Sequence, residues 1–225
     1  EGGSKRRFAD RLIREEMSEG ANEFVYGGCP ANGYAQMSIT LQAKAYGAKA
    51  TFFMAKRNME NLHEYQKKAL DYGADIRWVP NGMLQVTKKR ALDYYNEDPV
   101  NRRLLQLGLD DNRVREDIRD LAKTIETDYN INVSEIWSVG SSGTLTRGLQ
   151  MAFPDKDVHV VSVGHTMAQY EVGRAILHRS HLKFTQEVKE EDMPPFPSVP
   201  TYDAKAWKVM REHAKPGSLF WNVGK

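Results

Sequence analysis

The sequence predicts an α/β fold with twisted, mostly parallel sheets flanked by helices. The first observation is that short runs of β-branched and aromatic residues alternate with segments of helical hydrophobic spacing, as at residues 50–79. This alternation is typical of strand–helix–strand units whose strands run parallel. The second observation is that two strands are followed by glycine-rich turns that lead directly into helices, at residues 27–34 and 140–144. Turns of this kind fit the same architecture.

The individual elements follow from the same patterns. Strands are expected at residues 23–26, 50–54, 75–79, 135–139, 157–164 and 218–222. Helices are expected from Phe8 onward and at residues 35–46, 58–72, 90–95, 113–129, 145–152 and 204–213. Lys5 is placed at a turn just before the first helix, because glycines precede it. Residues 189–200 combine acidic side chains with four prolines, which predicts a loop or a mobile cover.

Length and composition restrict the class of protein. The 225 residues are enough for one large domain or two small ones, and 32 Lys+Arg against 30 Asp+Glu do not by themselves favour a nucleic-acid partner. The single cysteine, Cys29, excludes an internal disulfide and agrees with a reducing compartment. No apolar run reaches membrane-spanning length and the start of the chain is charged, so we expect a cytoplasmic protein without a membrane partner. The first residues, Glu1-Gly2-Gly3, look clipped.

The turn at residues 138–148 has the composition of an anion-binding loop. Its glycines let the backbone approach a ligand, its hydroxyl groups are hydrogen-bond donors, and the start of the following helix adds free amides. A helix capped by Ser142 or Thr144 is an equally simple interpretation at this point. The turn lacks the Lys-Ser or Lys-Thr pair of a P-loop and the Gly-x-Gly-x-x-Gly spacing of a dinucleotide fold. It therefore suggests a phosphate without a nucleotide.

Other polar positions leave two interpretations open. Asn32, in the first glycine-rich turn, can cap the next helix or reach a ligand. The basic run Lys5-Arg6-Arg7 can be a solvated tail, or it can present a lysine to a pocket. The six histidines lack metal-ligand spacing, so no metal site is expected, and His165 follows a strand that ends near the expected site.

Four segments in this order resemble the fold-type II pyridoxal phosphate enzymes, the tryptophan synthase β family. Within that family they are most similar to the branch of 1-aminocyclopropane-1-carboxylate deaminase and D-cysteine desulfhydrase. The segments are Gly3-Ser4-Lys5-Arg6-Arg7, Gly27-Gly28-Cys29-Pro30-Ala31-Asn32, Gly140-Ser141-Ser142-Gly143-Thr144 and Pro200-Thr201-Tyr202-Asp203-Ala204-Lys205. The resemblance covers Gly3 to Gly224 in a shortened form. It implies two domains: a large cofactor-binding domain of residues 1–25 and 125–225, and a small α/β domain of residues 26–124.

The resemblance also implies pyridoxal 5′-phosphate as the cofactor and assigns roles to residues. Lys5 would carry the cofactor as a Schiff base and move the Cα proton of the substrate, while Asn32 would contact the ring oxygen and Asp203 the ring nitrogen. Tyr202 would assist a second proton transfer, although a core tyrosine is the simpler alternative. The phosphate would lie in a cup formed by Gly140, Ser141, Ser142, Gly143 and Thr144. The substrate would be bound by Ala31, Asn32, Gly33, Tyr34, Gln36 and Tyr202.

The sequence departs from the family pattern where the substrate would bind. Ala31 stands where relatives usually have serine, and Val223 stands where they have a threonine. These departures leave the cofactor residues in place and change the substrate residues. The substrates of the relatives are therefore not assumed.

Three functions are consistent with this pattern. The first is a pyridoxal phosphate-dependent lyase or deaminase acting at the Cα of an amino acid or amino-acid-like molecule, in a homodimer as is usual for the relatives. The second is an enzyme of viral thymidine hypermodification, in the host cytoplasm, that decarboxylates or eliminates from an amino acid attached to a DNA base. The basic runs Lys5-Arg6-Arg7 and Arg102-Arg103 would suit its anionic substrate. The third is a phosphate-binding α/β module without catalysis.

Overall fold

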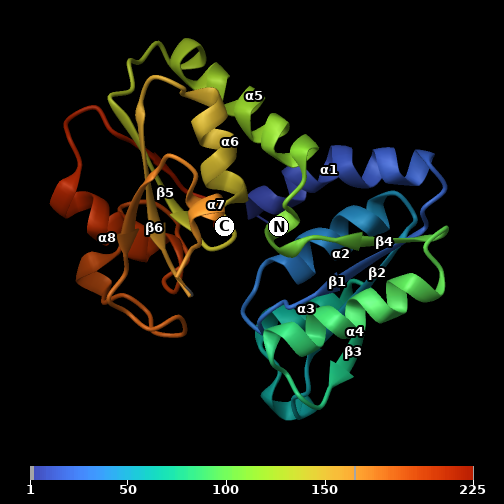
Figure 1. Ribbon diagram of the computed structural model, residues 1–225. Helices are drawn as coiled ribbons and strands as arrows, with labels where there is room; N and C mark the ends of the chain where they lie inside the picture. Colours follow the sequence, from blue (N-terminus) through green and yellow to red (C-terminus); the bar gives the residue numbers. More distant parts are fainter. Residues whose placement is uncertain (1–2, 165, 225) are drawn as a thin grey trace. The chain divides into compact units, whose positions relative to one another are not determined.

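A computed structural model of the chain describes residues 3–164 and 166–224. Glu1, Gly2, His165 and Lys225 lie outside the described residues. The chain divides into two compact units, Glu1–Leu109 and Asp110–Lys225, and we call them unit 1 and unit 2 (Figure 1). Each contains one four-stranded sheet in which every strand pair is parallel. The predicted α/β class with parallel sheets is confirmed.

Unit 1 alternates helices and strands along most of its length. Its elements are α1 (Gly3–Ser18), β1 (Glu23–Gly27), α2 (Ala35–Ala45), β2 (Lys49–Ala55), the 3-10 turn Met59–Asn61, α3 (Glu64–Asp71), β3 (Asp75–Val79), α4 (Leu84–Glu97), β4 (Arg102–Leu105) and the 3-10 turn Leu107–Leu109. The strand order is β3-β2-β1-β4. Helix α4 covers one face through a core that includes Val25, Phe53 and Ala91. Helix α2 packs against both β2 and α1.

Unit 2 repeats this architecture with the equivalent strand order, β7-β6-β5-β8, in which the third, second, first and fourth strands of the unit follow one another as in unit 1. Its elements are α5 (Asn112–Asp128), β5 (Glu135–Gly140), α6 (Thr144–Ala152), β6 (Asp157–Ser162), α7 (Gln169–Val172), β7 (Ile176–Arg179), the 3-10 turn Glu190–Asp192, α8 (Asp203–His213) and β8 (Leu219–Trp221). Trp137, Val139 and Val161 point to the α8 face, where they pack with Ala206 and Met210. Helices α5 and α6 pack closely on each other, and α6 contacts β5. Within unit 2, β5 and β8 are neighbours, so the loops that follow them lie side by side.

Several elements differ from the sequence-based expectation. Helix α1 packs on α2 in unit 1, whereas residues 1–25 were expected to join residues 125–225. Helix α3 begins at Glu64 rather than near residue 58, because the chain first makes a 3-10 turn and His63 then caps α3. Strands β4 and β7 were not predicted, since their charged residues hide the strand pattern: β4 begins with Arg102-Arg103 and β7 ends with His178-Arg179. Lys5 lies inside the first turn of α1 rather than before it.

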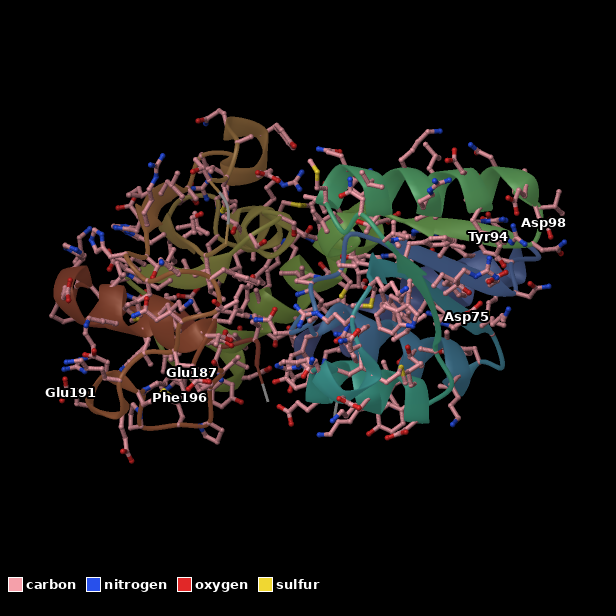
Figure 2. The ribbon with its side chains drawn as sticks, turned by 90° about the horizontal axis from the view of Figure 1, so that it is seen from below. Asp75, Tyr94, Asp98, Glu187, Glu191 and Phe196 are labelled. Atoms are coloured by element: carbon pink, nitrogen blue, oxygen red, sulfur yellow. The ribbon has the colours of Figure 1, made fainter. Side chains whose placement is uncertain are left out.

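Residues 189–200, for which a loop or a mobile cover was predicted, form a loop that includes the 3-10 turn Glu190–Asp192, and the longer segment of residues 183–200 is held at several points to unit 2. The buried Lys205 ammonium donates to the carbonyl oxygens of Lys183 at 2.7 Å and Phe184 at 2.9 Å. Asn222 donates to the carbonyl oxygen of Pro197 at 2.8 Å. Phe196 packs against two aromatic rings of unit 2 and Glu191 lies at the outer edge of the segment (Figure 2). These contacts fix the segment against the rest of unit 2.

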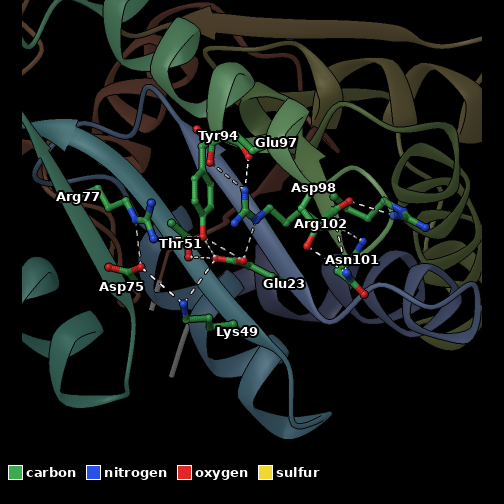
Figure 3. Close-up of polar contacts among 11 residues, drawn as sticks. Glu23, Lys49, Thr51, Asp75, Arg77, Tyr94, Glu97, Asp98, Asn101 and Arg102 are labelled. Atoms are coloured by element: carbon green, nitrogen blue, oxygen red, sulfur yellow. Dashed lines mark hydrogen bonds and ion pairs between the residues drawn. The ribbon is translucent and has the colours of Figure 1, made fainter.

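A buried charge network connects the amino ends of the four strands of unit 1. The Glu23 carboxylate accepts hydrogen bonds from Thr51, from Tyr94 at 3.1 Å and from Arg102 at 3.1 Å. Figure 3 shows Tyr94 between the guanidinium groups of Arg77 and Arg102, whose central carbons lie 3.9 Å and 3.4 Å from the ring centroid. Arg102 is therefore bound within unit 1, and Arg103 pairs with Glu16 at 2.6 Å. These two arginines give no support to an anionic substrate site.

No helix within residues 3–164 and 166–224 is long and apolar enough to cross a bilayer.

Candidate functional site

The first group of candidate site residues lies in unit 1, at the carboxyl end of β1. Strand β1 ends at Gly27, and the loop of residues 28–34, which we call the asparagine loop, leads into α2. Burial raises the pKa of the Cys29 thiol in this loop to about 12, while the positive charge of Lys5 lowers it. Because charges act strongly only over short distances, Lys5 lies near the asparagine loop. The structure thus brings together the predicted cofactor lysine and the loop that contains Asn32.

The asparagine loop is held by buried hydrogen bonds. Gln36, which is fully buried in the first turn of α2, donates through Nε2 to the carbonyl oxygens of Ala31 at 2.8 Å and Gly33 at 2.9 Å. The capping interpretation of Asn32 is wrong, because the N-cap of α2 is Tyr34 and its side chain makes no capping hydrogen bond. The side chain of Asn32 is partly exposed. Asn32 is therefore a residue whose function lies outside helix capping.

Aromatic rings surround the end of this loop. Tyr34 contacts Tyr65 edge to face with ring centroids 4.7 Å apart, and Tyr65 contacts His63 in the same way at 4.7 Å. Burial raises the pKa of Tyr65, so its phenol is neutral at pH 7. Burial also lowers the pKa of His63, so its imidazole is mostly neutral. The result is an uncharged, partly exposed aromatic cluster next to Asn32, which sequence patterns did not reveal because Tyr34 and Tyr65 lie 31 residues apart.

The second group lies in unit 2, where the predicted cup follows β5. Gly143 is the N-cap of α6, and its φ of 76° is in the left-handed region that favours glycine. A Cβ at this position would lie 2.0 Å from the carbonyl oxygen of Glu171, so the backbone here approaches α7 too closely for any other residue. No side chain caps α6, which makes the capping interpretation of Ser142 and Thr144 wrong. The first amides of α6 therefore have no side-chain cap in the structure.

The hydroxyl groups around the cup complete this surface. Ser141 and Ser142 are partly exposed, and Ser142 Oγ lies 3.4 Å from Thr144 Oγ1. Thr146 is fully buried below them, and among the described residues its Oγ1 has no hydrogen-bond partner. Gly140 lies tightly against its neighbours, since a Cβ there would lie 2.4 Å from Val160, 3.1 Å from Met167 Sδ and 3.3 Å from Thr146 Oγ1. The cup offers amide and hydroxyl donors without an acidic side chain, which fits a phosphate group.

Asp203 lies beside this cup, at the carboxyl end of the neighbouring strand. It is the first residue of α8 and is fully buried. Its Oδ1 accepts a hydrogen bond at 2.9 Å from the amide of Val223, two residues beyond β8. Gly224 packs against it so closely that a Cβ at this position would lie 2.5 Å from Asp203 Oδ2. A buried carboxylate at this position favours a positively charged or N–H donor group beside it.

For Tyr202, which was predicted to assist a proton transfer, the structure supports the simpler interpretation of a core tyrosine. Its ring packs against the α8-side core of unit 2. Burial raises its pKa, and the charge of Asp203 raises it further, so the phenol is neutral. Lys205, in contrast, was missed by sequence reasoning: it is 1% exposed, and burial lowers its pKa. A lysine one turn into a helix carries no sequence signal that distinguishes it from a surface residue.

A histidine stack lies at the other end of unit 2, near the amino ends of β5 and β6. His159 and His178 are joined by a 2.9 Å contact between ring nitrogens, His178 stacks on His213, and Trp137 stacks on His159 at 4.2 Å. Glu135 lies 3.4 Å from His159. Hydrogen bonds from neighbours outweigh the effect of burial and lower the pKa of Glu135 to about 2. The stack is separate from the cup, and in the described part of the chain no group of three or more His, Cys, Asp or Glu residues is arranged to hold a metal ion.

The comparisons with known proteins follow this geometry. No protein-family model matches the chain, and no curated protein matches it. Among solved structures, the chain is similar to an ACC deaminase homologue, with 16% identity, a TM-score of 0.81, and coverage of 99% of this chain and 79% of that chain. It is also similar to a threonine deaminase from T.th., with 15% identity, a TM-score of 0.69, and coverage of 100% and 84%. A fungal L-serine ammonia-lyase from Rhizomucor miehei matches with 12% identity, a TM-score of 0.67, and coverage of 98% and 83%.

At these identities the likeness concerns the fold, and it extends over both units. It agrees with the α/β architecture and with the parallel sheets. The chain has the fold of the fold-type II pyridoxal phosphate-dependent enzymes.

Proposed function

We propose that this protein is a pyridoxal phosphate-dependent lyase or deaminase that acts at the Cα of an amino acid or an amino-acid-like molecule. The observation that carries the proposal is the pairing of the anion cup with the buried Asp203 at the carboxyl ends of adjacent strands in unit 2. Pyridoxal phosphate, when bound, supplies an electron sink for negative charge at Cα. The cup fits its phosphate and Asp203 fits its ring nitrogen. Lys5 and Asn32 are the further residues that the resemblance assigns to this cofactor.

Each residue has a task that its chemistry allows. Ser141, Ser142 and the first amides of α6 bind the phosphate dianion, which a helix N-terminus favours. The Asp203 carboxylate, when charged, would keep a proton on a nitrogen beside it, because opposite charges stabilise each other strongly in a buried site. Lys5 supplies the primary amine, and once free it is the base that moves the Cα proton.

The covalent role of Lys5 gives the sharpest test. The purified protein is incubated with pyridoxal 5′-phosphate and reduced with borohydride, and the labelled peptide is identified by mass spectrometry. We expect a yellow protein with the label on Lys5, no label in Lys5→Ala, and a normal label in Lys44→Ala, which removes an exposed lysine of α2. A colourless protein that takes up no cofactor would favour the non-catalytic phosphate-binding module.

A second substrate class is favoured by the aromatic cluster of Tyr34, Tyr65 and His63. Ala31 removes a hydroxyl from the predicted carboxylate-binding loop, while uncharged rings lie next to Asn32. This surface suits a substrate with a flat ring, such as an amino acid attached to a DNA base, on which the same cofactor would support decarboxylation or elimination.

Free amino acids and DNA that contains amino-acid-modified thymine are then compared as substrates, with product analysis by mass spectrometry. Turnover of modified DNA alone, with binding that weakens as salt is added, favours the second class. Turnover of free amino acids alone excludes it. Gel filtration of the holoenzyme tests the expected homodimer.

A further inference from the structure

We infer that Gln36 is a positioning residue, which fixes Asn32 by binding the carbonyl groups of the residues on either side of it. This inference rests on the proposed function. A single nitrogen, Gln36 Nε2, donates to Ala31 O at 2.8 Å and to Gly33 O at 2.9 Å. The chain between these two carbonyl groups consists of Asn32 and the amide nitrogen and Cα of Gly33. The backbone of Asn32 is therefore held from both ends by one buried side chain.

Further contacts fix the position of Gly33, whose carbonyl group is the second acceptor of Gln36. The amide of Gly33 donates to the carbonyl oxygen of Pro30 at 2.9 Å, and the Cys29 thiol lies 3.8 Å from the carbonyl oxygen of Gly33. A Cβ on Gly33 would lie 2.9 Å from Cys29 Sγ and 3.0 Å from Pro30. Gly33 consequently has little freedom to move. The hydrogen bond from Gln36 to Ala31 O then fixes the peptide group between Ala31 and Asn32 relative to this turn.

The buried amide of Gln36 is itself unfavourable for stability. Gln36 is fully buried, and among residues 3–164 and 166–224 its Oε1 has no hydrogen-bond partner. A buried acceptor without a partner destabilises a fold, and an apolar side chain of the same length would avoid this. Only an amide, however, offers two donors on one uncharged atom. We therefore infer that this unfavourable burial is offset by the stabilisation of the asparagine loop through the two donors.

Holding the loop matters for Asn32 because its side chain is short. The reach and direction of an asparagine amide follow its backbone, and the Asn32 side chain is partly exposed, where it would otherwise be mobile. A site whose residues are already in position loses less entropy on binding. Gln36 thus affects cofactor binding only through Asn32.

The test compares Gln36→Met, which keeps the length and removes both donors, with a matched control on the same helix. Gln42→Met is that control, because Gln42 is also buried and donates to Asp10 rather than to the asparagine loop. The dissociation constant of pyridoxal 5′-phosphate is measured by fluorescence titration, together with the absorption spectrum of the bound cofactor. We expect Gln36→Met to raise the dissociation constant about tenfold and to shift the spectrum, and Gln42→Met to change the constant by less than about twofold.

A double-mutant cycle separates positioning from a merely structural role. If Gln36 acts through Asn32, then Gln36→Met raises the dissociation constant by less than about twofold when Asn32→Ala is already present. Fully additive effects would overturn the inference, and so would a Gln36→Met protein that binds the cofactor like the wild type. Should Gln36→Met fail to fold, Gln36→Leu removes the same donors without adding a charge and is read in the same way. A wild-type protein that takes up no cofactor would instead refute the proposed function.

Discussion

Gly143 provides the most direct test of the cup, and the structure allows its effect to be worked out. In Gly143→Ala the new methyl group would lie 2.0 Å from the Glu171 carbonyl oxygen, whereas real Cβ atoms essentially never approach closer than 3.0 Å. The start of α6 and α7 must therefore separate by about 1 Å. Because the obstacle is backbone, it cannot rotate away as a side chain would.

The free-energy cost has two parts. A residue other than glycine in the left-handed region costs about 1–2 kcal/mol, and the stiffer unfolded chain returns about 0.4–1 kcal/mol. Forced separation of packed groups adds about 1–3 kcal/mol. We expect Gly143→Ala to lose about 2–4 kcal/mol in total. Because the amides of α6 move with the backbone, the affinity for pyridoxal 5′-phosphate should also fall on the order of tenfold.

Gly217→Ala is the matched control in the same unit. Gly217 has a similar φ of 83°, but the nearest atom to its Cβ would be Ser134 Oγ at an ordinary 3.5 Å. Urea unfolding is followed by tryptophan fluorescence, which reports mainly on unit 2 because Trp137, Trp207 and Trp221 lie there. The control should lose no more than about 1.5 kcal/mol and keep its cofactor affinity. If the two variants are equally stable and bind equally well, the close approach of Gly143 to α7 is not what shapes the cup.

The remaining predictions concern the cofactor acid and two buried networks. Asp203→Asn keeps the contact with the Val223 amide, so cofactor affinity should change by less than about threefold while turnover falls about tenfold or more, and unchanged turnover would refute the role of the acid. Glu23→Gln leaves the guanidinium of Arg102 and the hydroxyl of Tyr94 poorly paired, so the free energy of unfolding of unit 1 in urea should fall by about 3–5 kcal/mol. The exposed control Asp93→Asn should lower it by less than about 0.5 kcal/mol. Burial lowers the pKa of His159 below the ordinary 6.5, so the unfolded chain binds its proton at a higher pH than the folded chain does. The thermal unfolding midpoint of unit 2 should therefore fall as pH drops below about 6.5. A midpoint that stays constant down to about pH 5 would contradict a lowered pKa of His159 in the folded protein.

The order of elements could be predicted because hydrophobic periodicity is local. The strand Asp75–Val79 has the predicted bounds, and β1, β2 and β5 differ from theirs by one or two residues. Strand β4 was missed because Arg102 and Arg103 look like surface charges. Only the folded unit 1 supplies Glu23 and Glu16, which let arginines lie in a strand.

The candidate site was predictable in part, and for the same reason. Glycine and hydroxyl residues at a strand-to-helix turn predict an anion-binding loop within a few consecutive positions, and four segments in order, two of them glycine-rich turns, carried the resemblance to a family. The burial of Asp203 against Val223 and Gly224 was not predictable, since it depends on strands β5 and β8 being neighbours although 78 residues separate the end of β5 from the start of β8. The hydrogen bonds of Gln36 were likewise hidden, because a glutamine in a helix has no sequence feature that shows where its amide points.

The sequence by itself thus determined the alternation of strands and helices, the α/β class and the position of the two turns, because each of these depends on residues close together along the chain. Tertiary structure alone decided that Lys5 lies near the asparagine loop, that neither cup hydroxyl nor Asn32 caps a helix, and that Arg102 serves the interior of unit 1. These outcomes depend on which groups, far apart in the sequence, are packed against each other and removed from water. Desolvation is set by packing in three dimensions, which short-range patterns of the sequence do not specify.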